Sequence, residues 1–456
     1  MQQYGGSAAN NLTSILKTNE DADDEIETFR HSPYLSIDSL NDFLSSKTGE
    51  FSVLSLNSQS LQAKFDKLLV LLTHLKESMD FSFSAICVQE TWLTDSHDLS
   101  LLQIPGYKLI HQGRRCCGHG GLIIYLEEKF SFAIKPLSIN SAVWEGLFID
   151  INHDNLKSKV TLGNIYRPPM CNNNNSTIDT FINEFRPVVD KLSKESPNLL
   201  LTGDFNLNLL SINDRTKIQE YFDLFVTNGL YPKITLPTRF SRKSASLIDQ
   251  IFCKHNNDTQ NSTSGIIHTY ISDHLPYFTC VDIFRKTKLS PKFIHVYNNT
   301  PSAMTNFTTD VKQALTNEGF DTDLLADPNA NYGKLEKIIT SAKQKHLPSS
   351  LRKVNKYKHR LSPWITNGII KSIKFRDKLY KEVKLTNPDS PEHYIKNTNL
   401  HTYNGILQKN IRAAKRIYYE KQFNKYKNDI KKTKKRKKAL ITEFYGLNYT
   451  VCNPWG

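Results

Sequence analysis

Short apolar runs that each end in a polar residue constrain the fold of this chain more than any other feature. Residues 198–202 are such a run, and they lead directly into the sequence G-D-F-N at 203–206. Residues 51–57 alternate apolar and polar side chains, and residues 84–89 run into Glu90. Runs of this kind are typical of strands, and a helical repeat of apolar residues follows residues 51–57. The pattern predicts an α/β domain of mixed strands.

The remaining elements divide the chain into three parts. Further strands are predicted at residues 145–151, 160–166, 247–252, 266–271 and 277–281, and amphipathic helices at residues 177–192 and 215–228. Strand alternation stops near residue 285, and a helical pattern begins near residue 303. The predicted parts are a partly disordered lead-in of residues 1–48, an α/β domain of residues 49–284, and a basic helical connector and tail of residues 285–456.

Positive charge is concentrated in the last part of the chain. Residues 351–456 contain 26 of the 59 lysines and arginines and 7 of the 45 acidic residues, which leaves 33 basic against 38 acidic residues before them. A near-neutral body with a cationic appendage suits a polyanionic partner such as nucleic acid. A solvated basic tail would have the same composition, so both interpretations stay open.

Composition argues against membrane, zinc and disulfide-rich classes. No stretch approaches the roughly 18 to 20 consecutive apolar residues of a membrane span, and the N-terminal residues lack an apolar signal region. The seven cysteines include no C-x-x-C pair, so neither a zinc site nor a disulfide framework is expected. We expect a protein that works inside the cell, without a membrane partner.

Polar side chains with catalytic potential stand where the apolar runs end. They are Asn57, Glu90, Tyr166, Asp204, Asn206, Asp249 and the triplet Ser272-Asp273-His274. Phosphodiester hydrolysis needs a divalent cation held by oxygen atoms, a group that readies water, and donors for the charge that builds on phosphorus. The set contains side chains for all three tasks. Each residue alone also fits a turn or a cap, so the hypothesis depends on their number.

Eight short motifs, taken in order, resemble the endonuclease/exonuclease/phosphatase family, and within it the endonuclease domains of LINE-type non-LTR retrotransposons. The motifs are S-L-N (55–57), Q-E-T-W-L (89–93), G-G-L-I-I-Y (120–125), I-Y-R-P-P (165–169), L-T-G-D-F-N (201–206), L-P-T-R (236–239), L-I-D-Q-I-F (247–252) and I-S-D-H-L-P (271–276). The resemblance implies a DNase I-like, four-layer sandwich of two mixed sheets flanked by helices. It also implies Mg²⁺-dependent cleavage of double-stranded DNA, with Mn²⁺ as an alternative cation.

The resemblance further implies a role for individual residues. The implied catalytic residues are Asp204, Asn206, His274, Asp249 and Tyr166, the implied substrate-binding residues are Asn57, Thr238, Ser272 and Arg167, and the implied metal ligands are Glu90 and Asp273. In this scheme Asp204 activates water, and Asp249 is the partner of His274.

One position departs from the repair enzymes of the family. Where those enzymes carry an aspartate, this chain has Gln59, which cannot ionise and is a poorer Mg²⁺ ligand. The difference weakens a role in abasic-site repair more than it weakens nicking of DNA, because retrotransposon endonucleases commonly lack this acid too.

The region after about residue 290 resembles the connector that joins such an endonuclease to a reverse transcriptase, particularly residues 362–374 and 413–423. No polymerase core follows, so we expect a truncated or degraded element product, or a gene model of the 5′ part alone. The basic tail is expected to help hold DNA, and element RNA is a second candidate partner. The cluster at residues 431–438 equally fits a nuclear-import signal, which predicts a nuclear location.

Two other functions stay open at this point. A phosphatase with the same fold would act on nucleotides or inositol lipids with the same catalytic residues, although the Y-R-P-P and P-T-R stretches argue against it. A remnant that binds nucleic acid without cutting it is the other. The presence of every site residue favours a competent enzyme over the remnant.

Overall fold

The computed structural model describes residues 32–47, 49–114, 119–137, 139–140, 143–169, 178–241, 244–254, 262–285, 293–297, 300–317, 328–353 and 362–426. The chain forms two compact units, one of residues 1–285 with 360–456 and one of residues 286–359. In the second unit α6 (Pro301–Asn317) packs against α7 (Pro328–His346), and β17 (Phe293–Tyr297) pairs with β18 (Ser349–Lys353).

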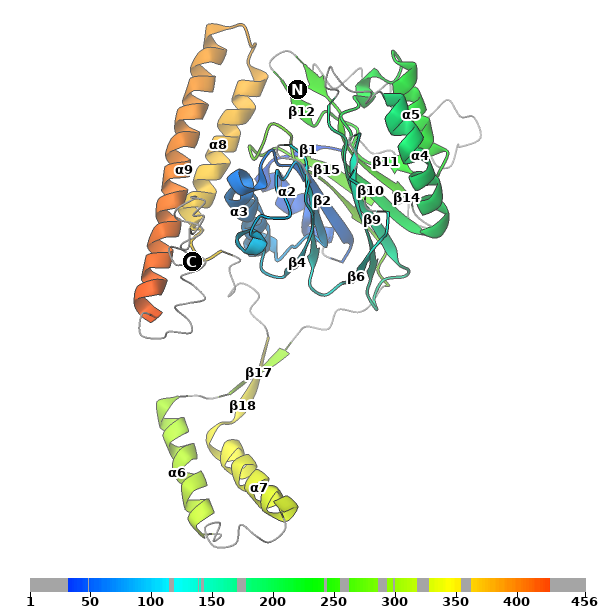
Figure 1. Cartoon of the computed structure of the whole chain (residues 1–456). Helices are drawn as coiled ribbons and strands as arrows, with labels where there is room; N and C mark the ends of the chain where they lie inside the picture. The colour runs from blue at the N-terminus through cyan, green and yellow to red at the C-terminus, as the bar shows by residue number, and fades with distance from the viewer. Residues whose placement is uncertain are drawn as a thin grey trace, which may run out of the picture. The chain divides into compact units, whose positions relative to one another are not determined.

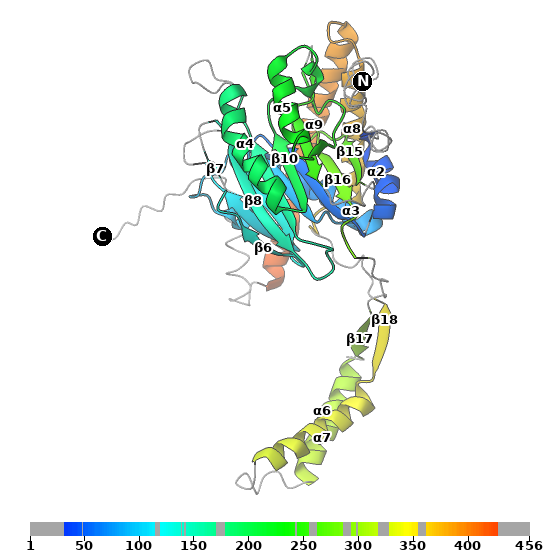
Figure 2. The same ribbon diagram turned by 90° about the vertical axis from the view of Figure 1, so that its right-hand side faces the viewer.

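Two mixed sheets lie face to face in the first unit (Figures 1 and 2). The strand order of the first sheet is β1 (Tyr34–Leu35), β15 (Ser262–Ile267), β16 (Tyr277–Val281), β2 (Phe51–Asn57), β3 (Ala85–Gln89), β5 (Leu122–Glu127) and β4 (Tyr107–Gln112). The order of the second is β11 (Tyr231–Pro232), β14 (Asp249–Lys254), β10 (Asn198–Asp204), β9 (Val160–Tyr166), β8 (Glu145–Asn152) and β6 (Ser131–Ile134), with β7 (Ile139–Asn140) also paired to β8. A separate hairpin joins β12 (Arg239–Phe240) to β13 (Ala245–Ser246).

Helices cover the outer face of each sheet, which makes the four layers (Figures 1 and 2). The helices against the first sheet are α2 (Ile37–Leu44), α3 (Leu61–Met79), α8 (Asn367–Leu385) and α9 (Pro391–Tyr426), and those against the second are α4 (Ile178–Glu195) and α5 (Thr216–Val226). Three short 3-10 turns lie at Ser45–Lys47, Leu99–Leu102 and Leu209–Ser211. The predicted fold class, an α/β sandwich followed by helices, is confirmed.

Strand β2 shows why the alternation of the sequence produces two buried faces. Phe51 and Val53 point into the core between the sheets, whereas Leu54 and Leu56 lie in the cluster beneath α3. Successive side chains of a strand point to opposite faces. Both faces of β2 are covered, so its seven residues are all buried.

The second half of the lead-in predicted for residues 1–48 is part of the sandwich. Residues 34–35 form β1, which pairs parallel with β15, and Ser32 exchanges hydrogen bonds with Thr235 across the chain. Leu40 and Leu44 of α2 are fully buried. These short elements add an edge strand and a covering helix to the first sheet, a place that depends on residues far along the chain. Residues 1–31 lie outside the described part.

The predicted single region of residues 285–456 also divides. Ile369 and Ile373 of α8 and Leu407 and Ile411 of α9 are buried in the same cluster as the leucines of α3. The reason lies in α3, where every residue from Leu68 to Leu75 is buried. A helix that is apolar on all sides needs cover on its outer side as well, and α8 and α9 supply it.

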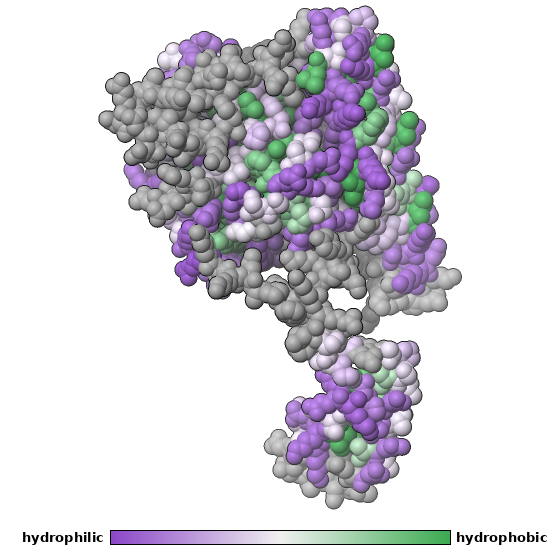
Figure 3. All heavy atoms as spheres, turned by 180° about the vertical axis from the view of Figure 1, so that it is seen from behind, coloured by the Kyte–Doolittle hydropathy of each residue, from purple (hydrophilic) through white to green (hydrophobic). Residues whose placement is uncertain are grey.

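The outer surface of α8 and α9 is polar and basic. In Figure 3, which shows the molecule from behind, these helices lie at the right-hand side, mostly hydrophilic with single hydrophobic groups between. Ile395, Ile406 and Ile417 are among the exposed apolar residues. None of the helices in the described ranges has the length and apolar composition to cross a membrane. The basic cluster at residues 431–438 lies outside the described residues.

Gly203 lies where a neighbouring strand of the second sheet leaves no room for a side chain. Strand β10 pairs with β9 on one side and β14 on the other, so Gly203 lies opposite both Ile165 and Gln250. A Cβ atom at this position would lie 1.8 Å from the carbonyl oxygen of Ile165. That contact is with backbone in the middle of a sheet, which cannot yield without breaking the ladder.

Gly203→Ala is therefore expected to lower the free energy of unfolding by about 2–4 kcal/mol, because the sheet must open to admit the methyl group. Urea denaturation of the full chain measures the change. Gly405→Ala in α9 is the matched control: nothing lies within 4 Å of its Cβ position, so it should be neutral or slightly stabilising. Equal unfolding energies for Gly203→Ala and the parent would contradict the close approach.

Candidate active site

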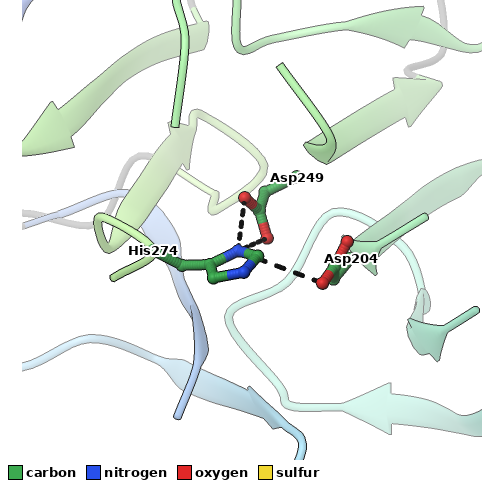
Figure 4. A group of neighbouring side chains, drawn as sticks. All are labelled: Asp204, Asp249 and His274. Carbon is green, nitrogen blue, oxygen red and sulfur yellow. Dashed lines mark hydrogen bonds and ion pairs between the residues drawn. The ribbon is translucent and has the colours of Figure 1, made fainter. Parts of the chain in front are cut away.

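Four polar residues from the two sheets meet at one end of the sandwich, and Figure 4 shows three of them, Asp204, Asp249 and His274. Asn57 is the last residue of β2, and Asp204 is the last residue of β10. Asp249 is the first residue of β14 and lies directly opposite Asp204 in the antiparallel ladder. His274 precedes β16 of the first sheet, so the cluster joins side chains of both sheets. The loops at one rim of a sandwich are where such residues can converge.

Asn57 connects carboxylates of the two sheets. Its Nδ2 atom donates to Glu90 Oε1 and to Asp204 Oδ2, both at 2.8 Å. Its Oδ1 atom accepts a bond of 3.2 Å from the backbone N–H of Gln59. That bond fixes which end of the amide faces the carboxylates. Gln59 therefore supports the site through its backbone N–H, a contact that does not depend on its side chain.

His274 is held by a second contact between the sheets. Its Nδ1 atom lies 3.0 and 2.9 Å from the two carboxylate oxygens of Asp249 and 3.9 Å from Asp204 Oδ2. The hydroxyl of Thr238 donates to Asp249 Oδ2 at 2.5 Å. Since Nδ1 is engaged, Nε2 is the ring atom left for another partner. The pairing predicted for Asp249 and His274 is present in the structure.

Burial and mutual charge shift the acidity of this cluster. Burial, strengthened by the charge of Asp249, raises the pKa of Asp204 to about 7, although His274 and the amide of Asn57 act in the opposite direction. Burial alone would lower the pKa of His274, but the carboxylates of Asp249 and Asp204 outweigh it and raise the pKa to about 9. At neutral pH the imidazole is thus cationic, and Asp204 is close to its own titration point.

Glu90 lies beside this cluster and is half-buried. Its Oε2 atom accepts a bond of 3.2 Å from the indole N–H of Trp92, while Oε1 faces Asn57. The phenol of Tyr166 lies nearby, with Asp204 opposite it in the parallel ladder. Burial, together with the charges of Glu90 and Asp204, raises the pKa of Tyr166 well above its usual value, so this phenol remains a proton donor.

Left-handed backbone is concentrated around these residues. Six non-glycine residues of the described ranges have positive φ, and all except Asp80 are at or next to the site: Gln59, Ser60, Glu90, Trp92 and Asn206. Each costs on the order of 1 kcal/mol or more, and such strain gathers where a site requires a particular side-chain direction.

Asn206 and Arg167 lie on the second-sheet side. The backbone N–H of Asn206 donates to Asp204 Oδ1 at 2.9 Å, and its side-chain amide donates to the carbonyl oxygen of Arg167 at 2.7 Å. Arg167, which was predicted to bind substrate, is 2% exposed, and its guanidinium lies 5.6 Å from the ring centre of Phe181. Its role in substrate binding stays a prediction.

The triplet at residues 272–274 separates into three environments. Ser272 is buried, and its hydroxyl donates to the backbone carbonyl of Asn57 at 2.7 Å, which ties the loop to β2. Asp273 is 41% exposed and accepts from Arg239 Nε and Nη2, each at 3.1 Å. Its Oδ1 atom lies 3.9 Å from His274 Nε2. Arg239 was not among the predicted site residues, although the P-T-R motif contains it.

The family model described as endonuclease/exonuclease/phosphatase matches residues 54–274. This domain belongs to that family.

Solved structures similar to the chain carry several activities in their names. They include the endonuclease domain of TRAS1, a telomere-specific non-LTR retrotransposon (14% identity, 52% of this chain, 100% of that chain, TM-score 0.37), a 3′-5′ exonuclease from Neisseria meningitidis (16%, 51%, 100%, 0.39), and a mannosyl-6-phosphatase from Bacteroides thetaiotaomicron (19%, 51%, 99%, 0.38). No curated protein matches the chain. At these identities and TM-scores, none of the three structures says which substrate this chain takes.

Glu145 is a residue of the endonuclease/exonuclease/phosphatase domain that sequence reasoning missed. It begins β8 opposite Tyr166, is 3% exposed, and accepts from the backbone N–H of Gly121 at 2.7 Å. Arg114 Nε lies 3.4 Å from its Oε1 atom. Burial raises its pKa, and the charge of Glu90 adds to the effect. The signal was a carboxylate at the start of an otherwise apolar run.

The oxygen-rich donor set fits a hard divalent cation. Asp204, Asp249 and His274 offer ligand atoms within 4.8 Å of one another, a grouping of three that recurs nowhere else in the described residues. Glu90 adds a less buried carboxylate on the other side of the Asn57 amide. Mg²⁺ prefers carboxylate and amide oxygens over imidazole. The predicted ligand Glu90 suits this preference, whereas Asp273 is already paired with Arg239.

Asn57→Ala should lower the free energy of unfolding by about 1.5–3 kcal/mol, because it removes a donor shared by two carboxylates and leaves them facing each other. Urea denaturation in EDTA measures the loss. Asn152→Ala, at an exposed position at the end of β8, is the control and should change stability by less than about 0.5 kcal/mol. A loss no larger than that of the control would show that the bridge is not needed.

Proposed function

We propose that the domain is a Mg²⁺-dependent endonuclease that hydrolyses phosphodiester bonds of double-stranded DNA, of the type that nicks target sites for non-LTR retrotransposons. The observation that carries the proposal is the meeting of Asp204 with the Asp249–His274 pair across two sheets. Attack of water on a phosphodiester needs a base, which a carboxylate with a pKa near neutral can be, and a cation for the charge on phosphorus, which a fixed imidazolium can be. Membership of the family supports this reaction class.

Asp204 is the proposed base. A carboxylate whose pKa is about 7 can take a proton from water near neutral pH and release it again. One of its oxygens is held by the Asn57 amide and the other by the backbone N–H of Asn206. These two bonds fix its direction, so that little motion is needed to present an oxygen to the attacking water.

His274 is the proposed stabiliser of charge on phosphorus. Asp249 holds Nδ1 and keeps the ring cationic, which leaves the N–H of Nε2 to donate to a phosphate oxygen. Tyr166 is a second donor, and the remaining N–H of the Asn206 amide is a third. Asp273 lies close enough to Nε2 to compete for it, but its own partner is Arg239. The donors come from both sheets and therefore surround the phosphate position.

The cation would be held by the carboxylate of Glu90, which the NH2 group of Asn57 keeps in place. When bound, Mg²⁺ or Mn²⁺ would polarise the phosphate and offset its negative charge. His274 and Tyr166 then bind the phosphate, and Asp204 takes the proton from water. A phosphatase would use the same catalytic groups, so only the substrate distinguishes that function from an endonuclease.

Asp204→Asn and His274→Ala should each reduce nicking of supercoiled plasmid by a factor on the order of 10² to 10⁴, since each removes an acid/base group or a charge-stabilising donor. EDTA should abolish the activity of the parent chain, and Mg²⁺ should restore it. Asp214→Asn, at an exposed position, is the control and should cut normally.

Three results would count against this function. Full activity of purified Asp204→Asn protein would remove Asp204 as the base. Release of phosphate from nucleotides or inositol phosphates without plasmid nicking would favour the phosphatase. A chain that binds plasmid in Mg²⁺ but cuts nothing would be the binding remnant.

The basic helices are proposed to contribute affinity without sequence preference. Lys409, Arg412 and Arg416 are exposed on one face of α9. Cations on a helix release counterions when they meet phosphates, and each contact adds about 0.9 to the slope of log affinity against log salt. Element RNA would be bound by the same chemistry, so the partner assigned to this face is duplex DNA, with RNA as the comparison.

Replacing all three by glutamine should flatten the salt dependence of duplex binding by up to about 2.7 in slope, while cleavage at saturating DNA stays unchanged. Filter binding between 50 and 200 mM salt gives the slope, and single-stranded RNA of equal length is the comparison. Lys191→Gln on α4, an exposed lysine against the other sheet, is the single-charge control. An unchanged slope in the triple variant would show that this face of α9 does not touch DNA.

A further inference from the structure

The loop that carries Ser272, Asp273 and His274 is bound by a helix from outside the family domain. Asp377 of α8 accepts a bond of 3.0 Å from the hydroxyl of Thr269 through Oδ2. Its Oδ1 atom accepts a bond of 3.0 Å from the backbone N–H of Tyr270. The family match ends at residue 274, whereas Asp377 lies more than a hundred residues later in the chain.

The bond to the loop is made by a buried, paired carboxylate. Asp377 is 6% exposed, and Arg376 beside it is 1% exposed. Arg376 donates to Asp377 Oδ1 through Nε at 2.9 Å and through Nη2 at 2.5 Å, and its guanidinium also lies over the ring of Tyr270. A buried carboxylate whose charge is matched is fixed in place, because turning it away would leave the arginine uncompensated.

Aromatic packing and a second charged group hold the same loop. The ring centre of Tyr380 lies 4.8 Å from that of Tyr270 and 5.3 Å from that of His268. On the other side Lys67 of α3 donates to the carbonyl oxygens of Tyr270 and Ile271, both at 3.3 Å. The loop is therefore held by α8 through one N–H group and one hydroxyl, and by α3 through two carbonyl groups, just before Ser272.

We propose that Asp377 is a positioning residue of the active site, which holds residues 268–274 so that His274 faces Asp249 and Asp204. The proposal rests on the proposed phosphodiesterase function. It makes α8 part of the catalytic unit, so the working enzyme extends beyond the family domain. A chain cut after residue 284 would keep every predicted catalytic residue and lose the group that orients one of them.

Other contacts of the same helices provide the contrast. Lys415 of α9 pairs with Asp66 of α3 at 3.1 Å, and Lys374 of α8 pairs with Asp38 of α2. These pairs attach α8 and α9 to the first sheet without touching residues 268–274. If α8 only covered apolar surface, losing the bonds of Asp377 would affect the enzyme no more than losing either of these pairs.

The test compares Asp377→Asn with Asp66→Asn in the full chain. Each replaces a carboxylate that pairs with a basic residue of α8 or α9. Only Asp377→Asn removes a group bonded to the loop. Steady-state nicking at temperatures equally far below each Tm should show kcat about 10- to 100-fold lower for Asp377→Asn, with KM changed less than about threefold. Asp66→Asn should keep the parent kcat. Amide exchange at Tyr270 should quicken by about tenfold or more in Asp377→Asn alone.

Several outcomes decide the matter. Equal kcat and equal Tyr270 exchange in the two variants overturn the proposal. If the parent chain does not cut DNA at all, the proposed function fails, and amide exchange alone tests whether Asp377 holds the loop. Unchanged protection of residues 270–274 in Asp377→Asn then overturns the proposal. If Asp377→Asn does not fold, Thr269→Val replaces it, because it removes the bonds of the Thr269 hydroxyl to Asp377 and Arg376 and leaves the Arg376–Asp377 ion pair in place. It should lower kcat about threefold, and an unaltered kcat would overturn the proposal.

Discussion

The structure depends on two contacts that join charged or polar groups of one sheet to carboxylates of the other. Asn57 of the first sheet donates to Asp204 of the second, and His274 of the first pairs with Asp249 of the second. Two carboxylates buried this deeply would repel each other and would be costly without partners. The packing of the sheets and the charge balance of the site therefore require each other: neither sheet alone could keep its acids buried.

The apolar character of α3 links this site to the C-terminal helices. Because α3 is buried on nearly every side, it needs α8 and α9 as an outer layer, and that layer brings Asp377 to the loop before His274. The same helix thus covers a core and holds the loop before His274.

Sequence reasoning predicted most elements of the sandwich, because their signals are local. The alternation in residues 51–57 and the apolar run before Asp204 identify strands without knowledge of their neighbours. It did not predict where residues 32–47 and α8 lie in the fold, because their places depend on what they cover. It also passed over Glu145 and Arg239, since a carboxylate at a strand start and an arginine in a loop become informative only when a partner such as Gly121 or Asp273 is known.

The sequence by itself determined the residue types that could carry out phosphodiester chemistry and the strand ends at which they stand. Only the tertiary structure decided which of them meet, that Arg167 points inward, that Asp273 is engaged by Arg239, and that Asp377 reaches the catalytic loop. The physical reason is distance along the chain. Strand and helix periods are set by neighbours a few residues away, whereas a site that spans two sheets and a distant helix is set by side-chain packing and charge pairing.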